Sequence, residues 1–122
     1  MAEARAFPAR PGSLAEIRRF IAAQAVERGL PEETVQDVVL AVNEASANAI
    51  IHTDSKEVRV TWEAVGSCVQ IKVEDQGTFR PSPAGTLRGG RGLLLMMALV
   101  DEFGLMRGSL SSPGTVVRLV KC

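Results

Sequence analysis

The sequence lacks an excess of charge of either sign. Its 122 residues include 14 lysines and arginines and 14 aspartates and glutamates, so the formal net charge is zero. Proteins that bind nucleic acid or another polyanion over a broad surface normally carry a basic excess. The equal numbers of basic and acidic residues argue against a general polyanion-binding protein and against direct contact with nucleic acid. They do not exclude a local phosphate site.

Cysteine is scarce, and no long hydrophobic run is present. The two cysteines, Cys68 and Cys122, lie outside any CxxC pattern, and no Cys/His cluster suggests a metal site. We expect two free thiols in a reducing cytosol, although the sequence leaves a disulfide between them open. The longest apolar stretches, residues 38–51 and 93–100, are too short to span a bilayer, which takes ~20 residues. Because a signal-peptide pattern is also lacking, we expect a cytoplasmic protein without membrane contact.

The proportions of apolar and charged residues are those of a globular domain. Apolar residues make up 46% of the chain and charged residues 23%. These values are ordinary for a folded protein, and the length suits a single domain. No internal repeat or low-complexity tract divides the sequence. We therefore expect one domain over residues 1–122.

Two helices are expected in the first half of the chain. Ser13 and Glu16 have the spacing of a capping box, and apolar residues at helical spacing follow them. Gly29 has the position of a helix C-cap. Pro31 opens a second helix, which carries acidic residues in its first turn and runs to about His52.

Alternating apolar and polar residues predict strands. Two alternating segments separated by a Gly-Ser turn indicate a β-hairpin with one wet face. After it, residues 78–90 contain two prolines and three glycines and are expected to form a loop, followed by an apolar helix over 91–100. The expected strands are 5–10 (at a sheet edge), 56–64, 69–74, 103–107 and 115–120. Hairpins with grouped helices favour an α+β two-layer sandwich, in which a mostly antiparallel sheet carries its helices on one face.

Glu44 and Asn48 stand out in the second helix because they lie one turn apart in an otherwise apolar run. Most apolar residues of that helix fall on one stripe, and Glu44 and Asn48 fall opposite to it. Leu40, Ala47 and Ile51 share their side. A solvated face and the floor of a pocket explain this pattern about equally well.

Three further signals are weak individually. Asp75 and Gly77 end the predicted hairpin, a pattern that is more often a simple turn. Glycines over 89–92 lead into a helix, where free backbone N–H groups and the helix dipole suit phosphate. Gly114 and Thr115 open the final strand. No P-loop and no Rossmann glycine pattern is present.

The order of these motifs resembles that of the GHKL ATPase superfamily, whose ATP-binding Bergerat fold also serves histidine kinases, gyrase and Hsp90. The likeness spans about residues 5–120 and is strongest to the anti-sigma factor serine kinases of the SpoIIAB/RsbW type. The stretches similar to the family's N, G1, G2 and last boxes are AVNEASANAIIHT, VEDQG, GRGLLLM and GTVVRL.

The resemblance implies roles for individual residues. Asn48 would bind Mg²⁺, and Glu44 would be the general base that accepts the proton of a partner's serine. Asp75 would accept a hydrogen bond from the adenine amino group of ATP, and Gly77 would let the base lie close. Thr115 would support Asp75.

The resemblance also implies that residues 78–90 form an ATP lid. The residues that would hold the phosphates are Gly90, Arg91, Gly92 and Leu93. The Arg91 side chain is equally compatible with a phosphate contact and with solvent, whereas Arg80 and Arg88 are expected in solvent. We interpret His52 as structural or at the pocket edge. The expected core residues include Trp62, Met96 and Met97.

As a function, the resemblance implies a serine protein kinase that acts as an anti-sigma factor in a partner-switching system. Such a kinase binds either a sigma factor or a STAS-domain anti-anti-sigma protein, and it phosphorylates the latter. It is usually a homodimer. The alternatives are an RsbT-like switch kinase, which would have the same pocket, and an ATP-binding module that transfers no phosphate.

Overall fold

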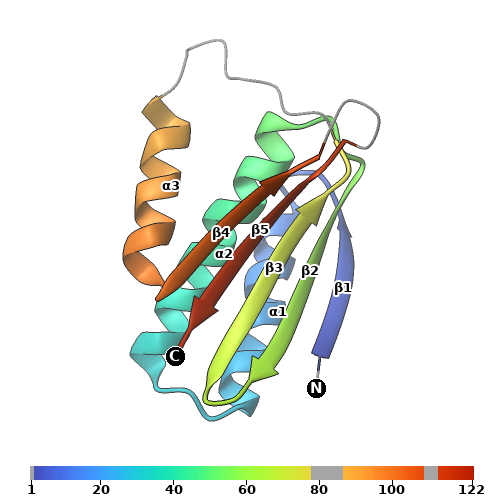
Figure 1. The fold of residues 1–122 in the computed structure, drawn as a ribbon. Coiled ribbons are helices and arrows are strands. Elements are labelled where there is room, and N and C mark those ends of the chain that lie inside the picture. Colours follow the sequence, from blue (N-terminus) through green and yellow to red (C-terminus); the bar gives the residue numbers. More distant parts are fainter. Residues whose placement is uncertain (1, 78–86, 109–112) are drawn as a thin grey trace.

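The structure is a computed structural model that describes residues 2–77, 87–108 and 113–122, with the backbone alone for residues 87–91. Within these ranges the elements are β1 (Ala2–Pro8), α1 (Ser13–Glu27), α2 (Glu32–His52), β2 (Glu57–Val65), β3 (Cys68–Asp75), α3 (Leu87–Leu99), β4 (Glu102–Arg107) and β5 (Thr115–Lys121) (Figure 1). Because α3 begins at Leu87, the last part of the predicted 78–90 loop is helical. The rest of that loop lies outside the described residues.

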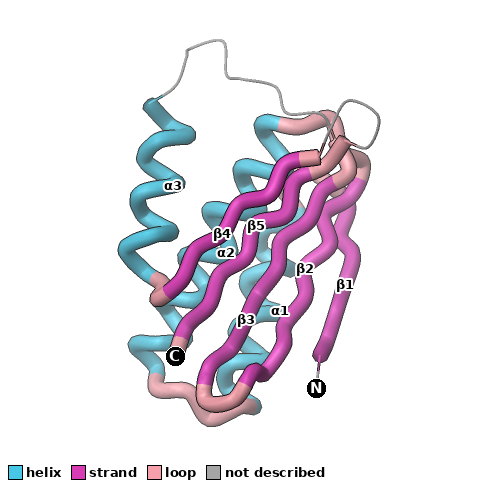
Figure 2. Tube along the Cα trace, viewed as in Figure 1, coloured by secondary structure: helices cyan, strands magenta, loops and turns pink. Residues whose placement is uncertain are grey.

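The five strands form one antiparallel sheet in the order β1-β2-β3-β5-β4. Figure 2 shows the helices together on one face of this sheet. The predicted two-layer α+β fold is therefore confirmed, and β1 lies at a sheet edge as expected. No helix in the described ranges is both long enough and apolar enough to cross a membrane.

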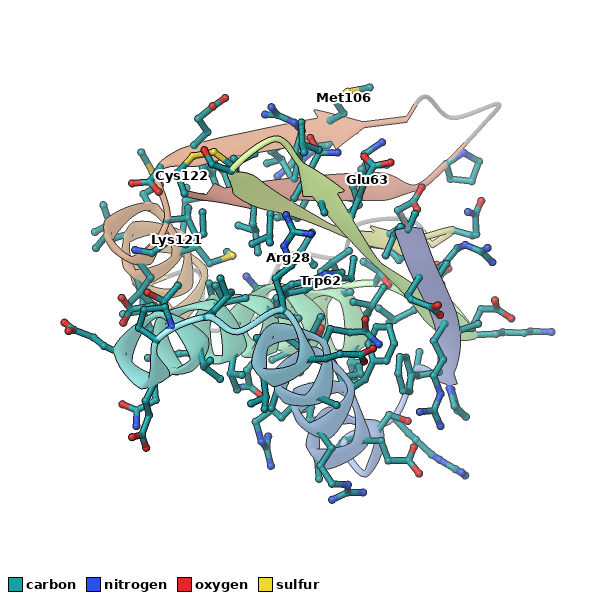
Figure 3. The ribbon with its side chains drawn as sticks, turned by 90° about the horizontal axis from the view of Figure 1, so that it is seen from below. Arg28, Trp62, Glu63, Met106, Lys121 and Cys122 are labelled. Carbon is teal, nitrogen blue, oxygen red and sulfur yellow. A yellow bond between two sulfur atoms is a disulfide. The ribbon has the colours of Figure 1, made fainter. Side chains whose placement is uncertain are left out.

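The core lies between the sheet and the helices. Trp62 of β2 is 4% exposed and Met96 of α3 is 2% exposed, so both are core residues as expected. Figure 3 views the two layers from their end, with Trp62 between them and Met106 on the opposite face of the sheet. The alternating side chains of β2 and β3 that complete this face are Val58, Val60, Val69, Ile71 and Val73.

Met97 was expected in the core, and this is wrong. Its side chain is 54% exposed, and its neighbours Leu93 and Leu94 on α3 are 36% and 68% exposed. Successive residues of a helix point about 100° apart. The face of α3 that buries Met96 therefore turns Met97 away from the sheet.

The ends of α1 follow one prediction and contradict another. The helix begins at Ser13 with Gly12 as its N-cap, and no side chain caps it, so the expected capping box does not form. At the other end Gly29 has a φ of 81°. Its N–H donates to Val26 O (2.9 Å), and the Leu30 N–H donates to Ala25 O (3.1 Å). This is a Schellman motif, in which glycine adopts the left-handed conformation at low energy.

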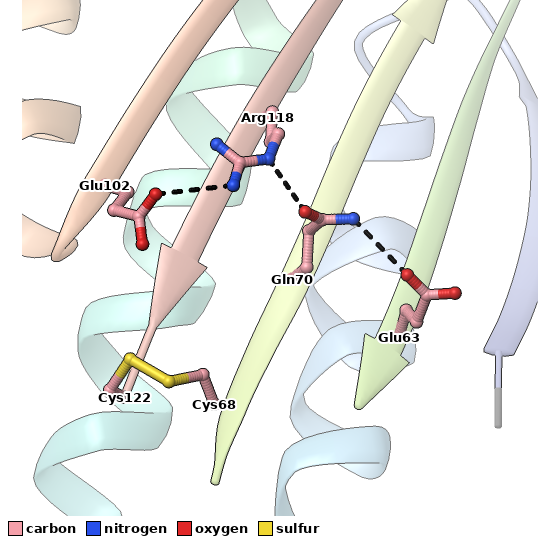
Figure 4. A network of polar contacts seen from close by, with 6 residues as sticks. All are labelled: Glu63, Cys68, Gln70, Glu102, Arg118 and Cys122. Atoms are coloured by element: carbon pink, nitrogen blue, oxygen red, sulfur yellow. Dashed lines mark hydrogen bonds and ion pairs between the residues drawn. A yellow bond between two sulfur atoms is a disulfide. The ribbon is translucent and has the colours of Figure 1, made fainter. Parts of the chain in front are cut away.

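The expectation of two free thiols is wrong, because Cys68 and Cys122 form a disulfide (Figure 4). Val69 pairs with Lys121 across β3 and β5. The two cysteines are the next residues outward, and their Cα atoms are 4.0 Å apart. Strand register thus brings together residues separated by 54 positions, which no local sequence pattern could specify.

The C-terminal end also anchors the surrounding elements. The Cys122 N–H donates to Asp101 Oδ2 (2.6 Å), and Lys121 Nζ donates to the carbonyl of Leu99, the last residue of α3 (2.9 Å). Lys121 also pairs with Asp37 of α2 at 3.5 Å. The end of β5 is therefore linked to both helices.

The sheet face without helices carries a polar network across four strands (Figure 4). Arg118 pairs with Glu102 at 3.3 Å and donates to Gln70 Oε1 at 2.7 Å. Gln70 in turn donates to Glu63 at 3.3 Å. These contacts join β2, β3, β5 and β4 across this face of the sheet.

Ser46 is a buried residue whose hydroxyl has no hydrogen-bond partner among the described residues. An unpaired buried hydroxyl is less favourable than an apolar group of similar size. We expect Ser46→Ala to raise the free energy of unfolding by about 1 kcal/mol, measured by urea denaturation. Ser67→Ala in the exposed β2–β3 turn is the control and should change it by less than about 0.5 kcal/mol. A loss of stability in Ser46→Ala would show that the hydroxyl makes a favourable contact.

Candidate functional site

Glu44 and Asn48 lie on α2 beside Gly92 of α3. A Cβ atom added at Gly92 of α3 would be 3.2 Å from Glu44 Oε2 and 3.5 Å from Asn48 Nδ2. The glycine therefore leaves a small space between the helices, lined by a carboxylate and a carboxamide. Both side chains are half-buried, whereas Leu40 and Ile51 on α2 are 42% and 63% exposed. Glu44 and Asn48 thus lie against α3, and the two apolar residues remain in solvent.

Asp75 and Thr115 are brought together by strand pairing. Asp75 ends β3, and Thr115 begins β5 directly opposite to it. Both follow the alternation that sends Val73 and Val117 toward the helices. The Asp75 side chain is consequently buried at the end of the sheet, with 4% of its surface exposed. Figure 1 shows this end of β3 at the same end of the molecule as the start of α3.

Burial raises the pKa of the Asp75 carboxyl. The Gly77 N–H, which donates to Asp75 Oδ1 at 3.1 Å, lowers this pKa, and the nearby charge of Asp54 raises it. A desolvated carboxylate is stabilised by each N–H donor that it gains. Asp75 is therefore suited to accept a hydrogen bond from an amino group on a bound ligand.

Gly77 has a packing role that the sequence did not indicate. A Cβ atom there would overlap the backbone N of Ser55 and lie 2.7 Å from Asp54 Oδ1. The position must therefore be glycine so that the end of β3 can lie against the α2–β2 connection. This reason is separate from the approach of a base that the resemblance implies.

Gly114 makes a similar close approach beside Thr115. Its φ is 144°, and a Cβ atom there would be 2.7 Å from the Asp75 carbonyl oxygen. Glycine tolerates both the positive φ and the close backbone. It therefore holds the start of β5 against the strand end that carries Asp75.

The glycine-rich segment differs from the prediction in one respect. Gly89–Gly92 were expected to lead into a helix, but they lie within α3. The free N–H groups of a helix belong to its N-cap and its first three residues, so in α3 the N–H groups of Gly90, Arg91, Gly92 and Leu93 are not among them. The side chains of Arg88 and Arg91 and the whole of Arg80 lie outside what the structure describes.

Asp54 and Ser55 border the candidate site, and sequence reasoning missed them. They follow α2 and contact a strand end that is more than 20 positions later in the chain, and no motif marks them. His52 is half-buried as the last residue of α2. Within the described residues, no group of three His, Cys, Asp or Glu side chains could hold a metal ion.

The sequence is similar to that of known proteins. A family model described as "Histidine kinase-like ATPase domain" matches residues 7–121. The chain is 28% identical over 114 residues to serine-protein kinase RsbW of Oceanobacillus iheyensis, covering 78% of this chain and 72% of the relative. It is 31% identical over 115 residues to serine-protein kinase RsbW of Bacillus licheniformis, covering 78% and 71%.

A solved structure supports the same fold. The chain is similar to the crystal structure of the RsbU and RsbW domains of Rv1364c from Mycobacterium tuberculosis, with a TM-score of 0.80 and 21% identity. The match covers 99% of this chain but spans only 32% of that longer one. From the family match, these relatives and the shared fold, the chain belongs to the histidine kinase-like (GHKL) ATPase family and, within it, to the SpoIIAB/RsbW type.

Proposed function

We propose that the protein is an ATP-dependent serine protein kinase that acts as an anti-sigma factor in a partner-switching system. The observation that carries the proposal is the placement of Glu44 and Asn48 together against Gly92. A carboxylate and a carboxamide side by side supply a proton acceptor and a metal ligand at one point. The relatives from Oceanobacillus and Bacillus are named serine-protein kinases, which supports the same activity here.

ATP fits the two parts of the site. Asp75 is buried and Thr115 pairs with it from the opposite strand. The adenine amino group would donate a hydrogen bond to Asp75, and Thr115 would support that carboxylate. Asn48 offers a hard oxygen ligand of the kind that Mg²⁺ prefers, and the phosphates and water would complete the set. When bound, Mg²⁺ would neutralise charge on the phosphate oxygens. The free N–H groups at the start of α3 would face the phosphates.

Glu44 would act on the acceptor in the transfer step. The serine oxygen of the partner protein bonds to the γ-phosphorus, while the bond from that phosphorus to the oxygen bridging it to the β-phosphate breaks. Glu44 accepts the hydroxyl proton, ADP leaves with the electron pair of the broken bond, and the proton passes to solvent. The products are a phosphoserine and ADP.

The acceptor in this proposal is a STAS-domain anti-anti-sigma protein, and its phosphorylation releases it. The unoccupied kinase would then bind a sigma factor. We also propose that the kinase works as a homodimer. An RsbT-like role would use the same pocket with a STAS scaffold as the substrate.

Calorimetric titration with ATP tests the proposal. We expect binding to the wild type that strengthens with Mg²⁺, and a loss of Mg-ATP affinity on the order of tenfold or more in Asn48→Ala. The control is Asn43→Ala, because Asn43 lies on the same helix but accepts a hydrogen bond from Arg18 of α1 (2.8 Å). If millimolar ATP fails to bind, the ATP site is rejected; if ATP binds without phosphotransfer to any STAS protein, the binding-module function replaces the kinase.

A further inference from the structure

The connection between α2 and β2 is fixed to the last turn of α2 by side-chain hydrogen bonds. The Thr53 hydroxyl, which is buried, donates to the Ala49 carbonyl at 2.6 Å. The same hydroxyl accepts the Ser55 N–H at 3.2 Å. Ala49 directly follows Asn48 in the chain. Ser55 is therefore held in a defined position relative to the helix that carries Glu44 and Asn48.

Ser55 is also bonded to the strand end that carries Asp75. Its hydroxyl accepts the Gln76 N–H at 3.0 Å and donates to the Glu57 carbonyl at 2.6 Å. A serine hydroxyl has a single proton. Because that proton points to Glu57, an oxygen lone pair is left facing Gln76. Gln76 lies between Asp75 and Gly77 in the chain.

Close packing reinforces these bonds. Gly77 approaches Asp54 and Ser55 so closely that no Cβ atom fits at this position. The Gly77 N–H is at the same time the donor to Asp75 Oδ1. A shift of the Gln76–Gly77 backbone away from Ser55 would therefore also move a hydrogen bond that orients the Asp75 carboxylate.

We propose that Ser55 is a positioning residue for recognition of the adenine base, acting through Gln76 and Gly77 on Asp75. This inference rests on the proposed function, in which ATP is the ligand and Asp75 accepts a hydrogen bond from the adenine amino group. Hydrogen bonds weaken steeply when distance and angle leave their optimum. A carboxylate held in place distinguishes an amino group, which donates to it, from a carbonyl oxygen, which repels it.

The test compares ATP with inosine triphosphate, which carries a carbonyl oxygen in place of the adenine amino group. Wild type and Ser55→Ala are titrated with each nucleotide in the presence of Mg²⁺. We expect wild type to prefer ATP, and Ser55→Ala to bind ATP roughly five- to tenfold more weakly with little change for inosine triphosphate. The affinity ratio between the two nucleotides should therefore fall. A merely structural role would weaken both nucleotides equally and leave the ratio unchanged.

The conservative variant Ser55→Thr keeps the hydroxyl and should retain the wild-type ratio. Because both hydrogen bonds of the Ser55 hydroxyl lie at the protein surface, Ser55→Ala should remain folded, which its thermal unfolding checks. An unchanged ratio in Ser55→Ala, with wild type preferring ATP, would overturn this inference and leave the proposed function intact. A wild type that binds no ATP would overturn both.

Discussion

Glu44→Gln is expected to lose phosphotransfer by a factor of about 10² to 10⁴ while its affinity for Mg-ATP stays close to wild type. Glutamine has nearly the shape of glutamate, so the space beside Gly92 and the position of Asn48 should be kept. What is lost is a group that can accept the serine proton. The measurement is the single-turnover transfer of labelled γ-phosphate to a purified STAS-domain protein from the same organism, with calorimetry for ATP.

The matched control for this change is Glu33→Gln. Glu33 lies in the exposed first turn of the same helix, about three helical turns before Glu44. It should transfer phosphate at the wild-type rate. Equal rates for wild type and Glu44→Gln would reject Glu44 as the base. A parallel loss of ATP affinity would instead show that Glu44 contributes to nucleotide or metal binding.

Removal of the Cys68–Cys122 disulfide is expected to have the largest effect on stability. The bond closes a loop between residues 54 positions apart. In the chain-entropy description, a cross-link over that distance restricts the unfolded chain by about 4 kcal/mol. For a domain of this size, the melting temperature should fall by on the order of 10–20 °C. Thermal unfolding with and without a dithiol reductant measures the difference.

The double variant Cys68→Ser/Cys122→Ser provides the control for this experiment. It should melt near the reduced wild type, and the reductant should not change its melting temperature. The bond lies at the end of β3 opposite to Asp75, so ATP affinity measured well below the melting temperature should be kept. Two titratable thiols in the untreated protein, with a melting temperature insensitive to reductant, would contradict the disulfide.

The helices and strands of the fold were predicted from local sequence patterns. Alternation over residues 56–64 and 69–74 predicted the β2–β3 hairpin, since a half-buried strand exposes every second side chain. Helical spacing predicted α2, and its last residue is His52, about where the helix was expected to end. The order of hairpins and helices was enough to predict an antiparallel sheet with its helices on one face.

The boundaries of elements were predicted less well. Ser13 has the spacing of a capping residue, yet α1 begins at Ser13 itself with Gly12 before it. The glycines at 89–92 suggested a helix start, but α3 continues through them from Leu87. Propensity at a helix end is worth about 1 kcal/mol or less per residue, so the packing of the whole helix overrides it.

The sequence by itself determined the layers of this protein and named Glu44, Asn48 and Asp75 as candidates. Only the tertiary structure decided which residues surround them. Gly92 lies beside Glu44 and Asn48, Gly77 lies against Ser55, and Cys122 is bonded to Cys68. The physical reason is the sequence separation of the contacting residues. Periodicity reports the local environment of each residue, whereas these contacts join distant segments whose register is set by the packing of the whole domain.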